Sequence, residues 1–124
     1  MQNRKILVIE DETKVAAKIE RVLRGMGAID VRIASSSGEA IAMAQFFLPD
    51  LIIVSQNIAP ENNAIFTVNS ILEFHTPEII YLLDNHSGHL ITGALETHPA
   101  NFVVKPFGKQ QLEIAVKIAL RKSK

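Results

Sequence analysis

The sequence contains no cysteine and no tryptophan, and its 13 Lys and Arg residues equal its 13 Asp and Glu residues in number. The absence of cysteine excludes disulfides, thiolate metal sites and a cysteine nucleophile. Because the charges balance, nothing global indicates a nucleic acid or an acidic partner. No apolar run approaches the ~20 residues that a membrane span needs, and the N-terminus lacks a signal-peptide pattern. We therefore expect a cytoplasmic protein without membrane or nucleic-acid contacts.

What the sequence does contain is typical of a globular domain. It has 124 residues, of which 48% are hydrophobic, and this is enough to bury a core within one domain. No repeat or low-complexity segment divides the chain. We therefore expect a single domain over residues 1–124.

Short apolar runs alternate along the chain with stretches of helical periodicity. Continuous β-branched runs are typical of parallel strands covered on both faces. We predict strands over 5–9, 30–34, 51–54, 79–83 and 102–104. We predict helices on Val15, Ile19, Val22 and Met26, over 39–47, on Ile65, Val68 and Leu72, over 90–97 and over 109–121. This alternation indicates an α/β fold, a doubly wound parallel sheet of five strands with five helices. The edge-like alternation of 30–34 favours the strand order 2-1-3-4-5 of flavodoxin-like folds.

Local signals mark several of the predicted helices. The acids Glu10 to Glu12 should cap the first helix, and Ser36 and Glu39 have the spacing of a capping box. Gly93 lies inside the fourth helix, where glycine costs about 1 kcal/mol relative to alanine. Basic residues line one side of the first helix, and we interpret them as a solvated face: Lys14, Lys18 and Arg21.

Polar residues follow three of the predicted strands at the point where each strand ends. Glu10 and Asp11 follow the first strand, Ser55 the third and Lys105 the fifth. The carboxyl ends of parallel strands form the rim where ligands bind. Taken singly, an acid after a strand is commonly a helix cap, and a Lys-Pro pair is commonly a turn. Together, these residues predict a small charged pocket around Ser55.

Four motifs resemble the receiver domains of two-component response regulators, over essentially the whole chain. They are Ile6 to Glu12, Ala34 to Ala40, Pro49 to Val54 and Lys105 to Phe107. In that family, two acids and an aspartate after the third strand bind Mg²⁺, and the aspartate accepts a phosphoryl group from a histidine kinase. The resemblance therefore implies a part in phosphorelay signal transduction, with a histidine kinase as a partner and no enzymatic activity of the domain.

The resemblance also implies a role for each residue of the predicted pocket. Glu10 and Asp11 are the acids on the metal side, and Lys105 is the lysine that contacts phosphate. The backbone carbonyl of Asn57 stands where the family supplies a further metal ligand. The family's Lys-Pro bond is usually cis, so the resemblance implies a cis bond between Lys105 and Pro106.

The chain departs from the family at two positions that matter for phosphorylation. Ser55 replaces the acceptor aspartate, and Leu83 replaces the threonine or serine that hydrogen-bonds the phosphoryl oxygen. Leucine has no donor, so the switch that draws this hydroxyl to the phosphate is missing. Phe102 stands where the family has the aromatic whose rotamer reports activation, but its usual trigger is absent. We therefore predict a pseudo-receiver that is not phosphorylated.

The loss of the acceptor aspartate also changes the chemistry that the pocket can support. Mg²⁺ commonly uses one or two carboxylates, and with one of the family's three acids missing we expect its binding to be weak or absent. A serine needs a base to become a nucleophile, for which His86 is the candidate. Asp50 lies at the wrong end of its strand to be a substitute acceptor. Asp84 either points outward or turns inward, where it would pair with Lys105 and replace the missing charge.

The predicted last helix has an apolar arc wider than one packed face requires. Its core-facing residues are Leu112, Val116, Ala119 and Leu120, and the arc is widened by Ile114, Ala115 and Ile118. Receiver domains commonly pair through the fourth helix, fifth strand and fifth helix. We therefore expect a homodimer, or contact with an adjoining output domain, through Ile114 and Ile118. The alternative is a deeply packed helix with a few exposed apolar residues.

Two competing hypotheses for the function remain open. The first is a working receiver that uses Ser55 or a nearby acid as acceptor, which a stoichiometric phosphate adduct would establish. The second is a flavodoxin-like flavin binder, because the fold alone permits it. Against it, the loop Ser55 to Asn57 is not a glycine-rich phosphate cradle, and there is no tryptophan to stack on a flavin. A colourless purified protein would exclude the flavin binder.

Overall fold

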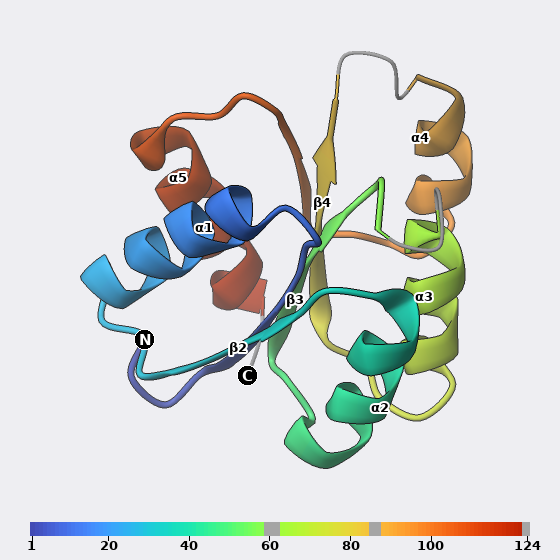
Figure 1. Cartoon of the computed structure of the whole chain (residues 1–124), viewed down its shortest axis with the longest axis horizontal. Coiled ribbons are helices and arrows are strands. Elements are labelled where there is room, and N and C mark those ends of the chain that lie inside the picture. Colours follow the sequence, from blue (N-terminus) through green and yellow to red (C-terminus); the bar gives the residue numbers. More distant parts are fainter. Residues whose placement is uncertain (59–62, 85–87, 123–124) are drawn as a thin grey trace.

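The computed structural model describes residues 1–58, 63–84 and 88–122, in which strands and helices alternate strictly (Figure 1). The elements are β1 Lys5–Ile9, α1 Thr13–Gly25, β2 Asp30–Ala34, α2 Ser37–Phe47, β3 Leu51–Ser55, α3 Ala64–Leu72, β4 Glu78–Leu83, α4 Gly88–Leu95, β5 Asn101–Val104 and α5 Lys109–Lys122. Every predicted strand and helix is present, with ends shifted by at most a few residues. Within the described ranges, no helix is long and apolar enough to cross a membrane.

The five strands form one parallel sheet in the order β2-β1-β3-β4-β5. This confirms the predicted flavodoxin-like topology. Helices α1 and α5 cover one face of the sheet, and α2, α3 and α4 cover the other (Figure 1). Strand β2 lies at one edge, with Val31 and Ala34 buried and its other three side chains more exposed.

The central strands are continuously apolar because they contribute to two cores. Successive side chains of a strand point to opposite faces of the sheet. In β1, Ile6 and Val8 pack with residues of α1 and α5, whereas Leu7 and Ile9 pack with residues of α2 and α3. All four side chains are fully buried. The carboxyl ends of β1 and β3 are therefore held rigidly from both sides.

The helix starts differ in detail from the sequence prediction. Glu12, the N-cap residue of α1, makes no side-chain capping hydrogen bond; the carboxylate of Glu10 instead accepts the N–H of Glu12 at 3.0 Å. At α2, the Ser36 hydroxyl accepts the N–H of Glu39 at 3.2 Å as predicted. The Glu39 carboxylate accepts the N–H of Ser35 at 2.7 Å rather than that of Ser36, and the helix begins at residue 37, earlier than expected.

The buried stripes of α1 and α3 are rotated from the predicted ones. The buried residues are Ala16, Ile19, Val22 and Leu23 in α1, and Ala64, Thr67, Val68 and Ile71 in α3. Thr67 is tolerated in the core because its hydroxyl is satisfied: it hydrogen-bonds the Ser37 hydroxyl at 2.6 Å and the Asn63 carbonyl at 2.7 Å. Hydrophobic periodicity cannot recognise a buried but satisfied hydroxyl.

Gly93 lies where α4 approaches α3. A Cβ atom at this position would come within 2.8 Å of the Cδ1 atom of Ile65. The glycine that weakens the helix by its propensity therefore also permits the two helices to pack closely.

Candidate functional site

Ser55 lies at the carboxyl end of the sheet, in the middle of the strand order. Ser55 is the last residue of β3, whereas the sequence pattern predicted that it follows a strand ending at residue 54. It pairs in register with Leu82 of β4. Its side chain is completely buried. The chain then turns, with the N–H of Ile58 donating to the Ser55 carbonyl at 3.3 Å.

Lys105 joins the predicted pocket residues into one cluster. Its backbone N–H donates to the Leu83 carbonyl at 2.7 Å, and its bond to Pro106 is cis, as the resemblance implies. Its ammonium donates to the Ser55 hydroxyl oxygen at 3.0 Å and lies 2.9 Å from Oε1 of Glu10. The sheet thus brings together residues from three strand ends that are far apart in the sequence.

The charges of this cluster are balanced internally. Glu10 has a fully buried side chain, whereas that of Lys105 is 16% exposed. Oε2 of Glu10 accepts the Glu12 N–H, but Oε1 makes no hydrogen bond of acceptable geometry and is held by the charge of the ammonium alone. Glu12 is a more distant second partner of the ammonium, at 4.0 Å and largely exposed. Removing either Glu10 or Lys105 would leave the other charge poorly compensated.

Chemically, the cluster holds Ser55 without activating it. An ammonium group donates hydrogen bonds and cannot accept a proton. Among the described residues, this ammonium is the hydrogen-bond partner that the structure gives to the Ser55 hydroxyl. His86, the predicted candidate base, lies outside the described residues. Activation of a serine hydroxyl needs a base within hydrogen-bond reach, and the described contacts supply none.

The remaining acids are placed differently from Glu10. Asp11 is exposed. Asp50 lies at the opposite end of the sheet, where its carboxylate accepts the N–H of Lys5 at 2.7 Å, as its position before the strand predicts. Asp84 is half-buried, and the described ion pairs of Lys105 are with Glu10 and Glu12. Pairing of Asp84 with Lys105 therefore stays a prediction.

Gln56 is a residue of the site that sequence reasoning missed. It is 5% exposed, its backbone N–H donates to the Leu82 carbonyl at 3.0 Å, and its side-chain oxygen accepts the N–H of Asp84 at 3.0 Å. Its amide thus ties the loop after β3 to the loop after β4. Asn57, in contrast, is exposed. The sequence feature that could have identified Gln56 as a site residue was its position directly after Ser55.

Lys18 also has a structural role that the sequence did not indicate. It donates to the backbone carbonyl of Phe107, and its ammonium lies 4.5 Å from the centre of the Phe107 ring. A cation over an aromatic face is attracted by the ring's negative face. Lys18 therefore anchors the loop that follows Lys105 onto α1, and the interpretation of this residue as purely solvated was wrong.

The two positions that the resemblance predicts as switch residues, Leu83 and Phe102, are both packed against neighbouring side chains. Leu83 is 4% exposed and lies in the core beneath α2, α3 and α4. The Phe102 ring stacks on Tyr81, with ring centroids 5.7 Å apart and an interplanar angle of 19°. The Tyr81 hydroxyl hydrogen-bonds Thr97 at 2.8 Å. Since the Thr97 hydroxyl donates to the Ala94 carbonyl, Tyr81 is the donor to Thr97, and Phe102 is coupled through it to the end of α4.

Burial raises the pKa of the Tyr81 hydroxyl. A raised pKa means that the unfolded chain loses this proton first, so the contribution to stability is complete below the unfolded value of about 10 and is lost as the pH rises through the folded value. We expect Tyr81→Phe to lower the free energy of unfolding by about 1 kcal/mol at neutral pH. Above about pH 10, the wild type should lose more stability than the variant, which urea unfolding across this range measures. Parallel curves for the two proteins would contradict this.

The pocket fits Mg²⁺ in the kind of donor it offers but is short of negative charge. Mg²⁺ prefers oxygen ligands, including one or two carboxylates. The buried Oε1 of Glu10 is held by the Lys105 ammonium at 2.9 Å. Asp11 follows Glu10 in the sequence, and Asn57 lies two residues after Ser55. In the described part of the chain, no three His, Asp or Glu side chains gather as a metal cluster. Weak or absent Mg²⁺ binding remains a prediction.

Comparison with known proteins connects this geometry to one family. The family described as "Response regulator receiver domain" matches residues 6–117. The transcriptional regulatory protein PdtaR of Mycobacterium tuberculosis is 26% identical over 117 residues, which are 94% of this chain and 57% of that protein. The phyllosphere-induced regulator PhyR of Methylorubrum extorquens is 27% identical over 116 residues, 93% of this chain and 43% of that protein. The chain thus spans about half the length of these relatives.

Solved structures show the same fold. A putative response regulator from Chloroflexus aurantiacus has a TM-score of 0.84 and 27% identity, with 95% of this chain and 98% of that chain covered. A response regulator receiver domain from Clostridium thermocellum has a TM-score of 0.86 and 24% identity, covering 96% and 95% of the two chains. The sheet order and helix arrangement described above are therefore those of the family.

Proposed function

The chain belongs to the response regulator receiver domain family, and we propose that it is a pseudo-receiver of a two-component system, acting through protein contacts without phosphorylation. One observation supports the proposal most directly: Ser55, to which the resemblance assigns the acceptor position, is completely buried, and its hydroxyl accepts a hydrogen bond from Lys105. The family's acceptor is an ionised carboxylate that needs no base. Ser55 needs one, and Lys105 cannot supply it.

The surroundings of Ser55 support a single conformational state. The ammonium of Lys105 is already paired with Glu10 and Ser55. Leu83 offers no hydroxyl that a phosphoryl group could attract, and Phe102 is stacked on Tyr81. A ligand shifts an equilibrium only by its different affinity for the two states. Without an acceptor carboxylate at position 55 and a hydroxyl at position 83, a phosphoryl group has no contact through which it could favour a second conformation of the domain.

Amide chemical shifts test whether the domain has a phosphate-dependent state. We expect the ¹H–¹⁵N spectrum of the wild type to stay unchanged at β4, α4, β5 and α5 when acetyl phosphate and Mg²⁺ are added. Receiver activation would instead move a contiguous set of signals in these elements. Such a set of shifts, reversed when the donor is removed, would overturn the proposal.

Mg²⁺ alone should bind weakly, because the site contains one buried carboxylate that is already paired with Lys105. We expect the wild type to bind Mg²⁺ at least ~10-fold more weakly than Ser55→Asp, a difference of about 1.4 kcal/mol. Titration calorimetry of both proteins with MgCl₂ measures this. Equal affinities would show that the missing acid does not limit metal binding.

We propose that the module contacts its partner through the edge formed by α4, β5 and α5. Ile114 and Ile118 of α5 are 52% and 42% exposed, and Leu95 and Val104 are 54% and 43% exposed. Exposed apolar residues that gather on one side are typical of interaction surfaces. A second copy of the domain, an adjoining output domain or a histidine kinase would each cover this edge.

A dimer through this edge should depend on Ile118. A glutamate at position 118 would lose the hydration of its carboxylate in an apolar dimer contact, which costs free energy. We therefore expect Ile118→Glu to convert a wild-type dimer into a monomer. Light scattering over a concentration series measures the mass. Phe46→Glu is the matched control, because Phe46 is 87% exposed on α2, away from this edge. A wild type that is monomeric at high concentration would contradict the dimer, and equal effects of both variants would contradict the edge.

A further inference from the structure

The peptide group that joins Leu83 to Asp84 is hydrogen-bonded on both sides at the end of β4. Its carbonyl accepts the backbone N–H of Lys105 at 2.7 Å, and its N–H donates to the side-chain oxygen of Gln56 at 3.0 Å. Within a parallel sheet, the backbones of the neighbouring strands normally supply both partners. Here the partner on the β3 side is a side chain, so the position of this peptide group depends on the identity of residue 56.

The Gln56 side chain is itself held in place. Its backbone N–H donates to the Leu82 carbonyl at 3.0 Å, which continues the pairing of β3 with β4 by one residue beyond Ser55. Only 5% of the residue is exposed. A buried polar group that gives up its hydrogen bond does not readily regain one from water, so the bonded arrangement is favoured. Gln56 therefore holds Asp84 through a contact made by a buried side chain.

The peptide group between Leu83 and Asp84 lies next to the partner edge of α4, β5 and α5. Leu83 pairs in register with Val104 of β5, which is 43% exposed on that edge. The core cluster that contains Leu83 also contains Ala94 of α4. A shift of the peptide group would therefore displace Val104 through the strand pairing and disturb the core in which α4 packs.

Hydrogen bonds tie the chain to the central strands on both sides of α4. Asp84, which precedes the helix, is bonded to Gln56, and Thr97, which follows it, is bonded to the Tyr81 hydroxyl at 2.8 Å. The first of these bonds is made by the residue next to Ser55. The site at the end of β3 and the partner edge are therefore joined by one buried side chain.

We propose that Gln56 is a positioning residue that holds the edge of α4, β5 and α5 in one arrangement in the absence of phosphate. It acts through the peptide group after Leu83, the position at which the hydroxyl of the family's switch is missing. This inference rests on the proposed function, because the edge is the proposed partner surface. A partner that binds an edge already fixed in this way does not have to order it, which favours affinity.

Gln56→Met tests this role because it keeps the length of the side chain and removes the acceptor oxygen. The amide to follow is that of Lys105, whose hydrogen bond is to the Leu83 carbonyl and not to Gln56. We expect it to exchange with deuterium at least ~5-fold faster in Gln56→Met than in the wild type, because the peptide group has lost its other partner. Gln45→Met is the matched control, since Gln45 is exposed on α2, and it should change this rate less than ~2-fold.

Relaxation dispersion by NMR measures the consequence at the partner edge. We expect Val104 and Leu95 to show microsecond-to-millisecond exchange in Gln56→Met that the wild type lacks. Flat dispersion profiles at both residues in Gln56→Met would contradict the link between Gln56 and the edge.

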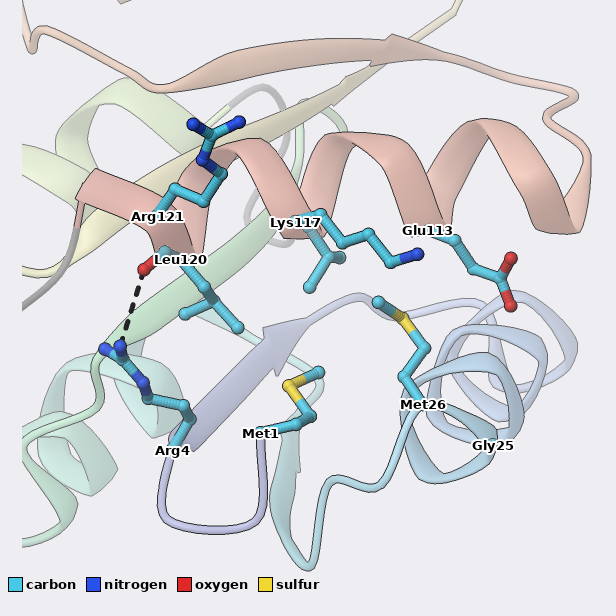
Figure 2. A pocket seen from close by; sticks show the side chains of 9 residues that line it. Met1, Arg4, Gly25, Met26, Glu113, Lys117, Leu120 and Arg121 are labelled. Atoms are coloured by element: carbon cyan, nitrogen blue, oxygen red, sulfur yellow. Dashed lines mark hydrogen bonds between the residues drawn. The ribbon is translucent and has the colours of Figure 1, made fainter.

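The opposite end of the sheet supplies reference amides away from Gln56. There a groove of about 630 Å³ lies between Met26 and Leu120, beside Arg4, which donates to the Leu120 carbonyl at 3.4 Å (Figure 2). The Met26 N–H donates to carbonyls of α1 at 3.1 Å. A substitution that only lowered the global stability would affect the amides of Met26 and α1 as well, whereas loss of a positioning residue affects Lys105 selectively.

Two results of the exchange measurement would overturn the proposal. One is an unchanged rate at Lys105 in Gln56→Met, and the other is an equal acceleration at Lys105 and Met26. The measurements need neither a phosphodonor nor a partner, so their outcome does not depend on whether Ser55 can be phosphorylated. A phosphate adduct on Ser55 would contradict the pseudo-receiver alone, and an unchanged rate at Lys105 would contradict the role of Gln56 alone.

Discussion

Replacing Ser55 with aspartate should give a domain that accepts a phosphoryl group from a small donor. The substitution places a carboxylate where the Ser55 hydroxyl now lies, 3.0 Å from the Lys105 ammonium. Lys105 and Glu10 already lie 2.9 Å apart beside this position, and the third acid adds the charge that Mg²⁺ requires. An ionised carboxylate attacks phosphorus directly, so no base has to be introduced.

Intact-mass spectrometry after incubation with acetyl phosphate and Mg²⁺ measures this gain. We expect Ser55→Asp to carry at least ~10-fold more phosphate than the wild type, a difference in reactivity of about 1.4 kcal/mol or more. The adduct should disappear with hydroxylamine, which cleaves acyl phosphates, and should need Mg²⁺. Ser55→Asn, which has a similar size and no charge, should remain unmodified. A folded Ser55→Asp that takes no phosphate would show that Glu10, Asp11 and Lys105 are not placed for phosphoryl transfer.

Removal of the Lys105 ammonium should produce the largest loss of stability among single substitutions at the site. Lys105→Met keeps much of the apolar stem but leaves the Glu10 carboxylate buried without its close partner. Breaking a buried ion pair from one side costs about 3–5 kcal/mol. Because Lys105 is partly exposed and water can reach its place, we expect the free energy of unfolding to fall by about 3 kcal/mol, near the lower end of that range.

Urea unfolding at neutral pH measures this loss, and a second substitution separates charge from packing. Adding Glu10→Gln to Lys105→Met removes the uncompensated charge, so the double variant should regain about half of the loss. Lys109→Met is the matched control, because Lys109 is 73% exposed and only loosely paired with Glu113, and it should cost less than about 0.5 kcal/mol. A Lys105→Met variant as stable as the control would contradict the assignment of Glu10 and Lys105 as a buried pair.

The sheet could be predicted because its strands are almost purely apolar. In β1 and β3 every apolar side chain enters one of two cores, so the apolar runs mark these strands without competition from other signals. The strand order followed from the contrast between these runs and the half-exposed pattern of residues 30–34. The placement of Glu10, Ser55 and Lys105 on one rim then followed from topology alone.

The contacts that sequence reasoning missed are polar contacts between distant segments. The hydrogen bond of Thr67 with Ser37 and that of Tyr81 with Thr97 join residues from different elements. The position of Lys18 over Phe107 joins α1 to the loop before α5. Serine, threonine and lysine are mostly surface residue types when seen alone, and only the fold shows which residues meet.

The most direct test of the account is the mass of the unmodified wild-type chain after incubation with acetyl phosphate and Mg²⁺, with Ser55→Asp treated in parallel. The account predicts that the wild-type mass does not change under conditions in which Ser55→Asp forms an adduct. A stoichiometric phosphate adduct on the wild type, mapped to Ser55 by peptide fragmentation, would contradict it.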